Sequence, residues 1–339
     1  MQSTISFVRL RTYLDKRPFL GRGFRKSVEK KMPIHKLRYS GLRGFFLLPL
    51  IFAIHFGYGQ IDLEMELHEN DVLKLEEIAK RMINDPFVDE RIAANTKFKE
   101  GLLSLLNQSS ARAQTFEEFE SISIVNSGDG FFRIFSWQIE INSNEFKHEG
   151  IIQFLRGDKG IVVLKDRSSE IMRPNTKELS TEQWFGTLYY NIVPFKSKGK
   201  SRYLLFGFDG ATSIENCKIA DILTIERDEI TFGAPLFLSK QNGKEQKEFR
   251  VFHQYDQNVK AVMNYDPNLE IIIYDHLIPW NSKEIGVGMT FVPDGSYQGF
   301  ELKKGKWRHI SKVFHHVSQS PIGPKNPTGA AINEKENQE

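Results

Sequence analysis

Apolar residues recur every three or four positions through the segment 60–118. The first run contains Val72, Leu75, Ile78, Ala79 and Met82. This spacing places the apolar residues on one face of a helix, with charged residues such as Glu76 and Lys80 on the opposite face. The pattern therefore predicts an amphipathic helix that ends near Asn84.

A second helical run follows Asp85-Pro86. Its periodic positions are Phe87, Arg91, Ala94, Phe98, Leu102 and Leu105. Asp85 has the capping chemistry that starts a helix, and proline is favoured at the first helical position. Since the connection between the two runs is short, we expect an antiparallel helical hairpin within residues 60–118.

The pattern changes at Ser121, where short runs rich in Val, Ile, Phe, Tyr and Thr begin and continue to about Val317. Turn signals separate these runs: Gly128-Asp129-Gly130, Gly157-Asp158-Lys159-Gly160, Asp209-Gly210, Arg227-Asp228-Glu229, Asp266-Pro267-Asn268 and Asp294-Gly295. Residues 119–317 therefore predict a mainly β domain, an antiparallel meander of about a dozen strands. The segment 214–222 fits a short helix as well as a strand, and Asp294-Gly295 predicts a hairpin turn.

Three arrangements of this meander remain open: a sandwich, a barrel-like body or a propeller-like body. The stretch 127–137, with its Gly-Asp-Gly turn followed by Phe-Phe-Arg-Ile-Phe-Ser-Trp, is similar to the turn and outer strands of a propeller blade. The turn signals recur at irregular intervals, however, which favours a sandwich or a barrel over a strict repeat. The last residues, 318–339, are rich in proline and charge and predict a disordered tail.

The segment 1–59 has the composition of a leader. Its apolar run Phe45–Ile54 follows a basic stretch, and small residues Gly57 and Gly59 precede a cleavage point before Gln60. This pattern predicts a secretory signal peptide, translated from Met32, and hence export to the periplasm or cell envelope. Two alternatives stay open, a basic cytoplasmic tail before a signal anchor and a transit peptide. Ten apolar residues are too few for a spanning helix, so we expect no stable membrane span after cleavage.

Composition narrows the class of protein. The chain has 339 residues, 40% hydrophobic and 26% charged, with a single cysteine, which excludes collagen-like, low-complexity and disulfide-framework proteins. The net charge of +3 comes from the leader, which holds 12 basic and 2 acidic residues. Residues 60–339 carry a net charge of −7. An acidic body argues against nucleic acid as a partner.

The most site-like segment ends a continuous apolar run with Asp275 and His276. Adjacent strand residues point to opposite faces, so these two cannot bind one metal ion unless the strand bulges or turns there. In the structural interpretation, Asp275 caps turn amides and His276 packs at the rim. In the catalytic interpretation, His276 is a base or metal ligand, with His253 or Asp256 across the sheet as its partner.

Other motifs give no support for a cofactor or a metal. Neither a phosphate-binding loop nor a dinucleotide fingerprint occurs in the sequence. His309, His315 and His316 lack the spacing and the carboxylate of a metal site, and Cys217 has the surroundings of a packing residue. We therefore predict neither a cofactor nor a metal centre.

Several stretches of the chain resemble an uncharacterised family of exported β-rich proteins of Gram-negative bacteria. They are Gly130–Trp137, Tyr203–Gly210, Phe232–Phe237, Tyr274–Leu277, Pro293–Phe300 and Lys304–Trp307. They span most of residues 120–310. The resemblance implies export and a β-rich body, and it assigns no catalytic residue.

These patterns together favour an exported, non-catalytic binding module of the periplasm or envelope, with an envelope partner or a small ligand. The alternative is a secreted hydrolase that uses Asp275 and His276 with His253 or Asp256. An enzyme requires His276 and a carboxylate to converge in one concave pocket. A binding module instead requires an exposed apolar or aromatic patch without converging titratable groups.

Overall fold

The structure, a computed structural model, describes residues 70–227, 229–241, 243–281 and 288–314. The predicted leader 1–59 with its start at Met32, the signal peptide and the tail 318–339 lie outside these residues. In the part of the chain that the structure describes, no helix is long and apolar enough to cross a membrane.

The predicted helical pair is confirmed. One helix occupies residues 70–84 and the second, α3, spans Val88–Leu106. The expected cap is displaced: α3 begins after Phe87, and the Asp85 carboxylate accepts a hydrogen bond from the Phe87 amide at 3.0 Å. Glu76 was expected on the solvated face, yet its side chain is buried, and its carboxylate accepts a hydrogen bond from the Ser121 hydroxyl at 2.7 Å.

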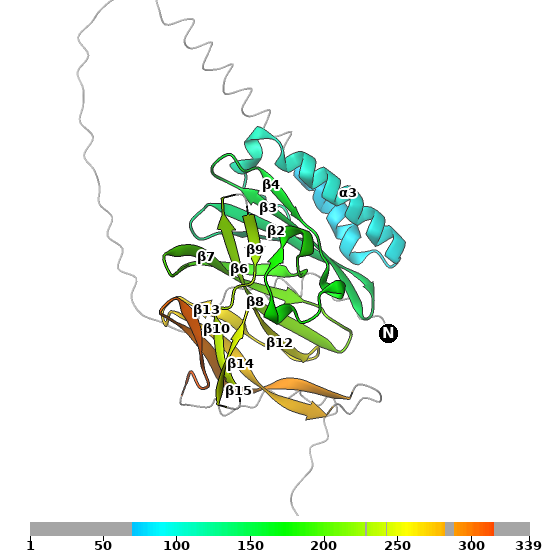
Figure 1. Cartoon of the computed structure of the whole chain (residues 1–339). Coiled ribbons are helices and arrows are strands. Elements are labelled where there is room, and N and C mark those ends of the chain that lie inside the picture. The colour runs from blue at the N-terminus through cyan, green and yellow to red at the C-terminus, as the bar shows by residue number, and fades with distance from the viewer. Residues whose placement is uncertain (1–69, 228, 242, 282–287, 315–339) are drawn as a thin grey trace, which may run out of the picture. The chain divides into compact units, whose positions relative to one another are not determined.

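The mainly β body is also confirmed, and it is built from three largely antiparallel sheets (Figure 1). The first sheet has the order β1-β2-β3-β4. Its strands are β1 (Ser123–Asn126), β2 (Phe132–Asn142), β3 (Glu145–Phe154) and β4 (Ile161–Leu164). Short 3-10 turns lie outside the strands: η1 (Ser109–Arg112), η2 (Ser168–Glu170), η3 (Pro174–Thr176) and η4 (Thr181–Gln183).

The second sheet has the order β5-β9-β8-β7-β6, and β12 also pairs with β8. Its strands are β5 (Leu179–Ser180), β6 (Leu188–Ser197), β7 (Lys200–Asp209), β8 (Glu215–Glu226), β9 (Glu229–Phe232) and β12 (Val251–Asp256). The segment 214–222, which fitted either a helix or a strand, lies almost entirely in β8. Pairing with β7 on one side and β12 on the other decides the outcome in favour of the strand.

The third sheet has the order β11-β10-β16-β15-β14-β13. Its strands are β10 (Phe237–Gln241), β11 (Lys244–Glu248), β13 (Met263–Asp266), β14 (Ile271–Asn281), β15 (Met289–Lys303) and β16 (Lys306–Ile310). The β10–β16 pair is parallel. The hairpin turn predicted at Asp294-Gly295 is wrong, because β15 runs through both residues. Gly295, with φ of 86°, instead lies in a β-bulge opposite Asp275–Leu277.

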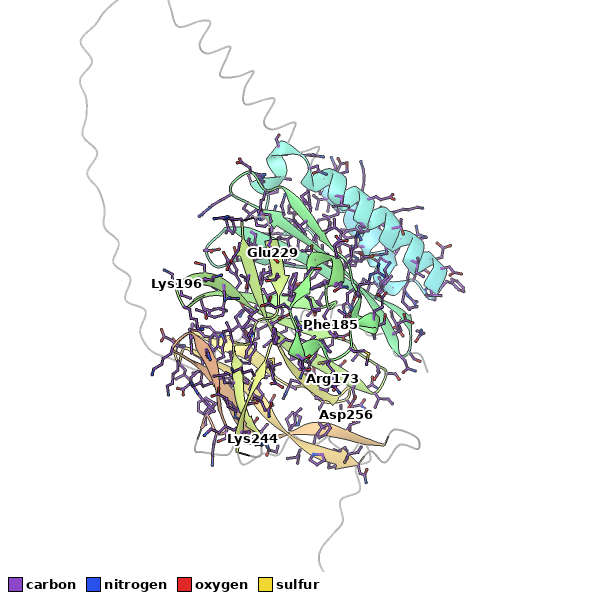
Figure 2. All side chains as sticks on the ribbon, viewed as in Figure 1. Arg173, Phe185, Lys196, Glu229, Lys244 and Asp256 are labelled. Carbon is purple, nitrogen blue, oxygen red and sulfur yellow. The ribbon has the colours of Figure 1, made fainter. Side chains whose placement is uncertain are left out.

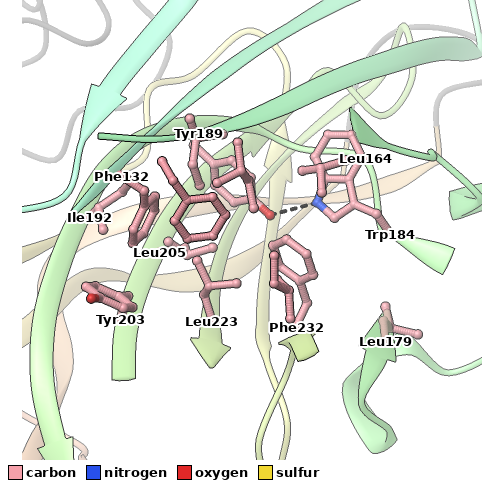
Figure 3. Close-up of a cluster of buried hydrophobic side chains, with 14 residues drawn as sticks. Phe132, Leu164, Leu179, Trp184, Tyr189, Ile192, Tyr203, Leu205, Leu223 and Phe232 are labelled. Atoms are coloured by element: carbon pink, nitrogen blue, oxygen red, sulfur yellow. Dashed lines mark hydrogen bonds between the residues drawn. The ribbon is translucent and has the colours of Figure 1, made fainter. Parts of the chain in front are cut away.

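Two apolar clusters join the sheets. The first cluster combines residues of the first and second sheets around Phe132, Trp184 and Leu205, and the Trp184 indole donates a hydrogen bond to the Tyr189 hydroxyl at 2.8 Å (Figure 3). The second cluster combines the second and third sheets around Leu204, Phe206 and residues of the last strands. Adjacent residues Leu204 and Leu205 thus pack into different clusters, as strand alternation requires. The second sheet therefore contributes one face to each cluster.

Helix α3 packs on the first sheet. The ring of Phe98 meets Trp137 of β2 edge to face at 5.2 Å. The Trp137 indole donates to the Asn95 side chain at 2.7 Å, and Asn95 in turn donates to Glu149 of β3 at 3.0 Å. Since Trp137, Asn95 and Glu149 are all buried, these bonds fix the orientation of α3 on the sheet while satisfying buried polar groups.

Candidate functional site

The four candidate residues lie on two strands of different sheets. Asp275 and His276 are adjacent on β14, at the bulge that interrupts its pairing with β15. His253 and Asp256 lie on β12 of the second sheet. The structure does not bring the four into one constellation: each has its own polar neighbours.

Asp275 is buried and bound to the backbone. Its carboxylate accepts a hydrogen bond from the Val262 amide at 2.5 Å, and its own amide donates to the Val262 carbonyl at 3.2 Å. Burial raises the pKa of Asp275 to about 6, against the opposing effects of the Val262 amide and of Lys218. The carboxylate therefore joins β14 to the segment before β13.

His276 belongs to a separate cluster in the bulge. Its Nδ1 lies 2.8 Å from Asp294 Oδ2, and the Ser296 hydroxyl donates to Asp294 Oδ1 at 2.7 Å. Burial raises the pKa of Asp294, but bonds from Ser296 and His276 together lower it below its usual value. A nucleophilic serine needs a hydrogen bond to the histidine that takes its proton. Ser296 bonds instead to the carboxylate, so the trio has the composition of a catalytic triad without its connectivity.

His253 is buried in an electropositive environment. It lies directly opposite Lys218 in the β8–β12 pairing, and its ring packs against Tyr274 at 5.3 Å. Its Nε2 atom is buried without a hydrogen-bond partner. Burial, followed by the nearby Lys218 charge, lowers the pKa of His253 to about 4. The imidazole is therefore neutral at physiological pH.

Asp256 connects β12 to β15. Its carboxylate accepts a hydrogen bond from the Thr290 hydroxyl at 2.8 Å and another from the Asn258 amide at 2.8 Å. Both Asp256 and Thr290 are buried. Figure 2 shows Asp256 where the second sheet lies beside the outer part of β14 and β15.

Lys218 is a buried titratable group that the sequence analysis did not identify. Its ammonium lies over the Tyr190 ring, 4.6 Å from the centroid, and burial lowers its pKa to about 8. The lysine falls in 214–222, the segment left open between helix and strand. Assigning a strand there would have placed Lys218 on the same face as Ala220 and Ile222, which signals a buried charge.

His148 is a second buried histidine that the sequence analysis missed. It lies on β3, with Nδ1 3.4 Å from Asp166 and Nε2 3.4 Å from Asp209. Burial lowers the pKa of His148, but the two carboxylates outweigh burial and raise it above the usual value. Its partners lie 18 and 61 positions away along the chain, so no local motif reveals the cluster.

These clusters offer little to a ligand. Across the described residues, no group of three or more His, Cys, Asp or Glu side chains could hold a metal ion. An open pocket of about 340 Å³ lies at the end of α3. Its lining residues Arg112 and Gln153 donate to backbone carbonyls, Arg112 to Gly157 and Lys159 and Gln153 to Leu106. These side-chain donors of Arg112 and Gln153 are thus engaged in hydrogen bonds within the protein.

An apolar surface does occur, on the outer parts of β14 and β15. Residues 277–281 pair with residues 289–293, and we call these ten residues the arm. Figure 1 shows the arm in orange, extending past the rest of its sheet. Its exposed large apolar side chains are Ile278, Trp280, Met289 and Phe291. A single exposed apolar residue is ordinary, but here two are exposed on each face of the paired strands, Ile278 and Trp280 on one face and Met289 and Phe291 on the other.

Comparison with protein-family models, with curated proteins and with solved structures finds no match for this chain. The resemblance to exported β-rich proteins therefore stays a prediction.

Proposed function

We propose that this protein is an exported, non-catalytic binding protein of the periplasm or cell envelope that docks through the arm. The observation that carries the proposal is the gathering of exposed Ile278, Trp280, Met289 and Phe291 on two paired strands. Burying such a group on a partner is favourable, because each removed square ångström of apolar surface contributes about 25 cal/mol. The leader pattern supports the location.

The alternative, a secreted hydrolase, is not supported by the geometry of its residues. Asp275 is held by the backbone of Val262, and His276 is paired with Asp294. Catalysis by the two together requires them to converge on one substrate, as the catalytic interpretation assumed. Their separate bonding partners favour the binding protein over the enzyme.

The experiment is fractionation of a Gram-negative host that expresses the full chain, followed by intact-mass analysis of each fraction. We expect a species that begins at Gln60, retained with the envelope. The double variant Met289→Ser/Phe291→Ser should be exported and processed equally but recovered in the soluble periplasmic fraction.

The matched control removes the same residue types outside the arm. Phe87 is 70% exposed and Met172 is 81% exposed, and neither belongs to the arm. The double variant Phe87→Ser/Met172→Ser should therefore stay with the envelope as the wild type does. Full-length protein in the cytosol would contradict export, and equal retention of both double variants would contradict docking through the arm.

A further inference from the structure

We infer that the chain's own segment 315–324, which follows the last described residue, lies over one face of the arm and covers it until a docking partner displaces the segment. The cover concerns this chain alone, whereas its effect on docking rests on the proposed function. Four features carry the inference: a free apolar face, the course of the chain that leads to it, the reach of the segment and its lack of charge.

The two faces of the arm differ in burial. Residues that pair directly lie on the same face of the ribbon. The inner face is turned toward β12, because Thr290 is buried there and donates a hydrogen bond to Asp256, and Val292 on the same face is buried as well. The alternate residues form the outer face, and none of them is buried: Leu277, Pro279, Asn281, Met289, Phe291 and Pro293. The outer face is therefore the free apolar surface of the arm.

The last described residues lie on this outer face, at the base of the arm. Tyr297 shares the face with Leu277, because its partner Asp275 lies two positions from Leu277 on β14. The Val313 amide donates a hydrogen bond to the Tyr297 carbonyl at 2.9 Å, and the Phe314 ring meets the Tyr297 ring edge to face at 5.8 Å. The described chain thus ends beside the outer face.

The chain also advances toward the arm at this point. Ile310 of β16 lies opposite Gly299, whereas Val313 is bonded to Tyr297, two positions closer to the arm along β15. A Cβ at Gly299 would lie only 3.0 Å from Val313 Cγ2, so Val313 packs against the outer side of Gly299. The same course past Phe314 leads onto the outer face of the arm.

The segment 315–324 is long enough to cover the whole outer face. Eight positions separate Tyr297 from Met289 along β15, and at about 3.3 Å each they span about 26 Å. Ten residues in the extended polyproline conformation span about 31 Å. Two prolines in the segment favour that conformation, because each ring fixes one backbone angle. The sequence predicts no fold of its own for residues 318–339, so the segment is available to lie on another surface.

The segment also matches the outer face in polarity. Its sequence, His-His-Val-Ser-Gln-Ser-Pro-Ile-Gly-Pro, contains no Asp, Glu, Lys or Arg, whereas the chain as a whole is 26% charged. Charged residues resume at Lys325, directly after the length that the face requires. Val317 and Ile322 supply apolar side chains for contact with Phe291 and Met289. An uncharged segment covers these residues without burying an unpaired charge, and its tether gives it a high effective concentration.

A cover of this kind regulates docking. Exposed apolar side chains on a β ribbon are an aggregation hazard, which native proteins reduce by covering the ribbon. A segment with few apolar residues binds weakly, and a partner that buries a larger apolar area displaces it. The outer face is therefore shielded before docking and available to the partner afterwards.

The test measures the access of hydrogen peroxide to Met289. Peroxide transfers one oxygen to an exposed thioether, giving the sulfoxide and water, and peptide mass spectrometry follows each methionine. The full-length variant Val317→Asp/Ile322→Asp places two charges in the covering segment. We expect Met289 to be oxidised about threefold faster or more in this variant than in the wild type, because a charged segment leaves the apolar face. Met172, 81% exposed and outside the arm, is the internal reference and should keep its rate.

The matched control is Ala330→Asp/Ile332→Asp, which adds the same two charges to the tail beyond the segment. Met289 should be oxidised in this control at the wild-type rate. An equal Met289 rate in the wild type and in Val317→Asp/Ile322→Asp would overturn the cover. Equal acceleration by the control would overturn it as well, since the effect would then not depend on the segment.

Envelope retention separates the cover from the proposed function. In the fractionation experiment, Val317→Asp/Ile322→Asp should be retained more strongly than the wild type, since its outer face is free. Faster oxidation of Met289 without any dependence of retention on the arm supports the cover and contradicts the proposed function. Unchanged oxidation of Met289 with arm-dependent retention overturns the cover and leaves the proposed function standing.

Discussion

Two buried histidines mark the two junctions between sheets, and their surroundings give them opposite properties. His148 lies between the carboxylates of Asp166 and Asp209, which raise its pKa above the usual value. His253 lies beside Lys218, and burial together with that charge lowers its pKa to about 4. Both side chains are at least nine-tenths buried. Burial lowers the pKa of both imidazoles; the two carboxylates reverse this effect at His148, whereas Lys218 adds to it at His253.

A perturbed pKa in either region does not by itself indicate a catalytic role. The His148 cluster brings the imidazole within 3.4 Å of the Asp166 and Asp209 carboxylates, across β3, β7 and the segment after β4. The His253 region is an uncharged imidazole next to a lysine over an aromatic ring. Perturbed pKa values are common at active sites, but structural ion pairs perturb them as well. In both regions, the groups described here contact protein rather than open space.

The largest expected effect comes from breaking the His148 network. Asp166→Asn removes the charge of a carboxylate that pairs with His148 and accepts hydrogen bonds from the amides of His148, Ser168 and Gly186. We expect a loss of about 3 kcal/mol in the free energy of unfolding, measured by urea denaturation at pH 6, because one partner of a buried pair is left uncompensated. The exposed Asp158→Asn is the control and should change stability by less than about 0.5 kcal/mol. A loss below about 1 kcal/mol for Asp166→Asn would refute the network.

The second prediction concerns the pH dependence of stability, which should have opposite signs at the two histidines. For His148, with a raised pKa, the stabilisation is complete below the unfolded pKa of about 6.5 and is lost as pH rises through the folded pKa. For His253, with a lowered pKa, no cost arises above about pH 6.5. A cost of about 3 kcal/mol develops as pH falls from there to about 4, since the unfolded state binds the proton first.

Urea unfolding between pH 4 and 9 of the wild type, His148→Gln and His253→Gln measures both effects. The advantage of the wild type over His148→Gln should shrink above pH 6.5. Its stability relative to His253→Gln should instead fall below pH 6.5. Asp275, with its pKa raised to about 6, contributes in the same acid range with the opposite slope, so only differences between variants isolate each histidine. Parallel profiles for the two variants would refute the comparison.

A smaller effect is expected from removing the charge beside His253. Lys218→Met keeps the length of the side chain and its contact with the Tyr190 ring while removing the ammonium. Removing the ammonium relieves its cost of burial but also removes its attraction to the Asp275 carboxylate, and because these two effects oppose each other, stability should change by about 1 kcal/mol or less. The pKa of His253, followed by NMR of its ring protons, should rise. An unchanged pKa would mean that burial alone depresses it.

The smallest effect on stability is expected at the arm. Met289 and Phe291 are exposed, so Met289→Ser/Phe291→Ser should change the free energy of unfolding by about 0.5 kcal/mol or less, as a surface substitution does. The midpoint of thermal unfolding should therefore shift only slightly. Differential scanning calorimetry measures it against Phe87→Ser/Met172→Ser. A large destabilisation would show that the arm stabilises the fold, which would contradict a role as a free docking element.

The sequence predicted the elements better than their contacts. The spacing of Ala79, Met82, Phe98 and Leu102 identified two helices, because one apolar face suffices to specify a helix. Runs of β-branched and aromatic residues identified most strands for the same local reason. The division of the strands into three sheets, and the packing of these sheets around two apolar clusters, could not be derived from the sequence. Pairing between distant strands leaves no local pattern.

The candidate site residues show the same contrast between local patterns, which the sequence carries, and contacts between distant residues, which it does not. Asp275 was expected to cap turn amides at a strand end, whereas it lies within β14 and its carboxylate accepts a hydrogen bond from the Val262 amide directly before β13. Asp294-Gly295 was misassigned because the same two residues suit a hairpin turn and a glycine bulge. His148, Asp166 and Asp209 meet only through the packing of β3, β7 and the segment after β4, which no spacing in the chain reveals.

Hydrogen–deuterium exchange with isolated envelope membranes tests the central claim, that the arm is the docking element, most directly. Amide exchange is measured for the full chain alone and with membranes, and peptides across the described residues are compared. The account predicts new protection at residues 277–281 and 289–293, absent in Met289→Ser/Phe291→Ser and present in Phe87→Ser/Met172→Ser. Protection elsewhere, such as along α3, with an unchanged arm would contradict it.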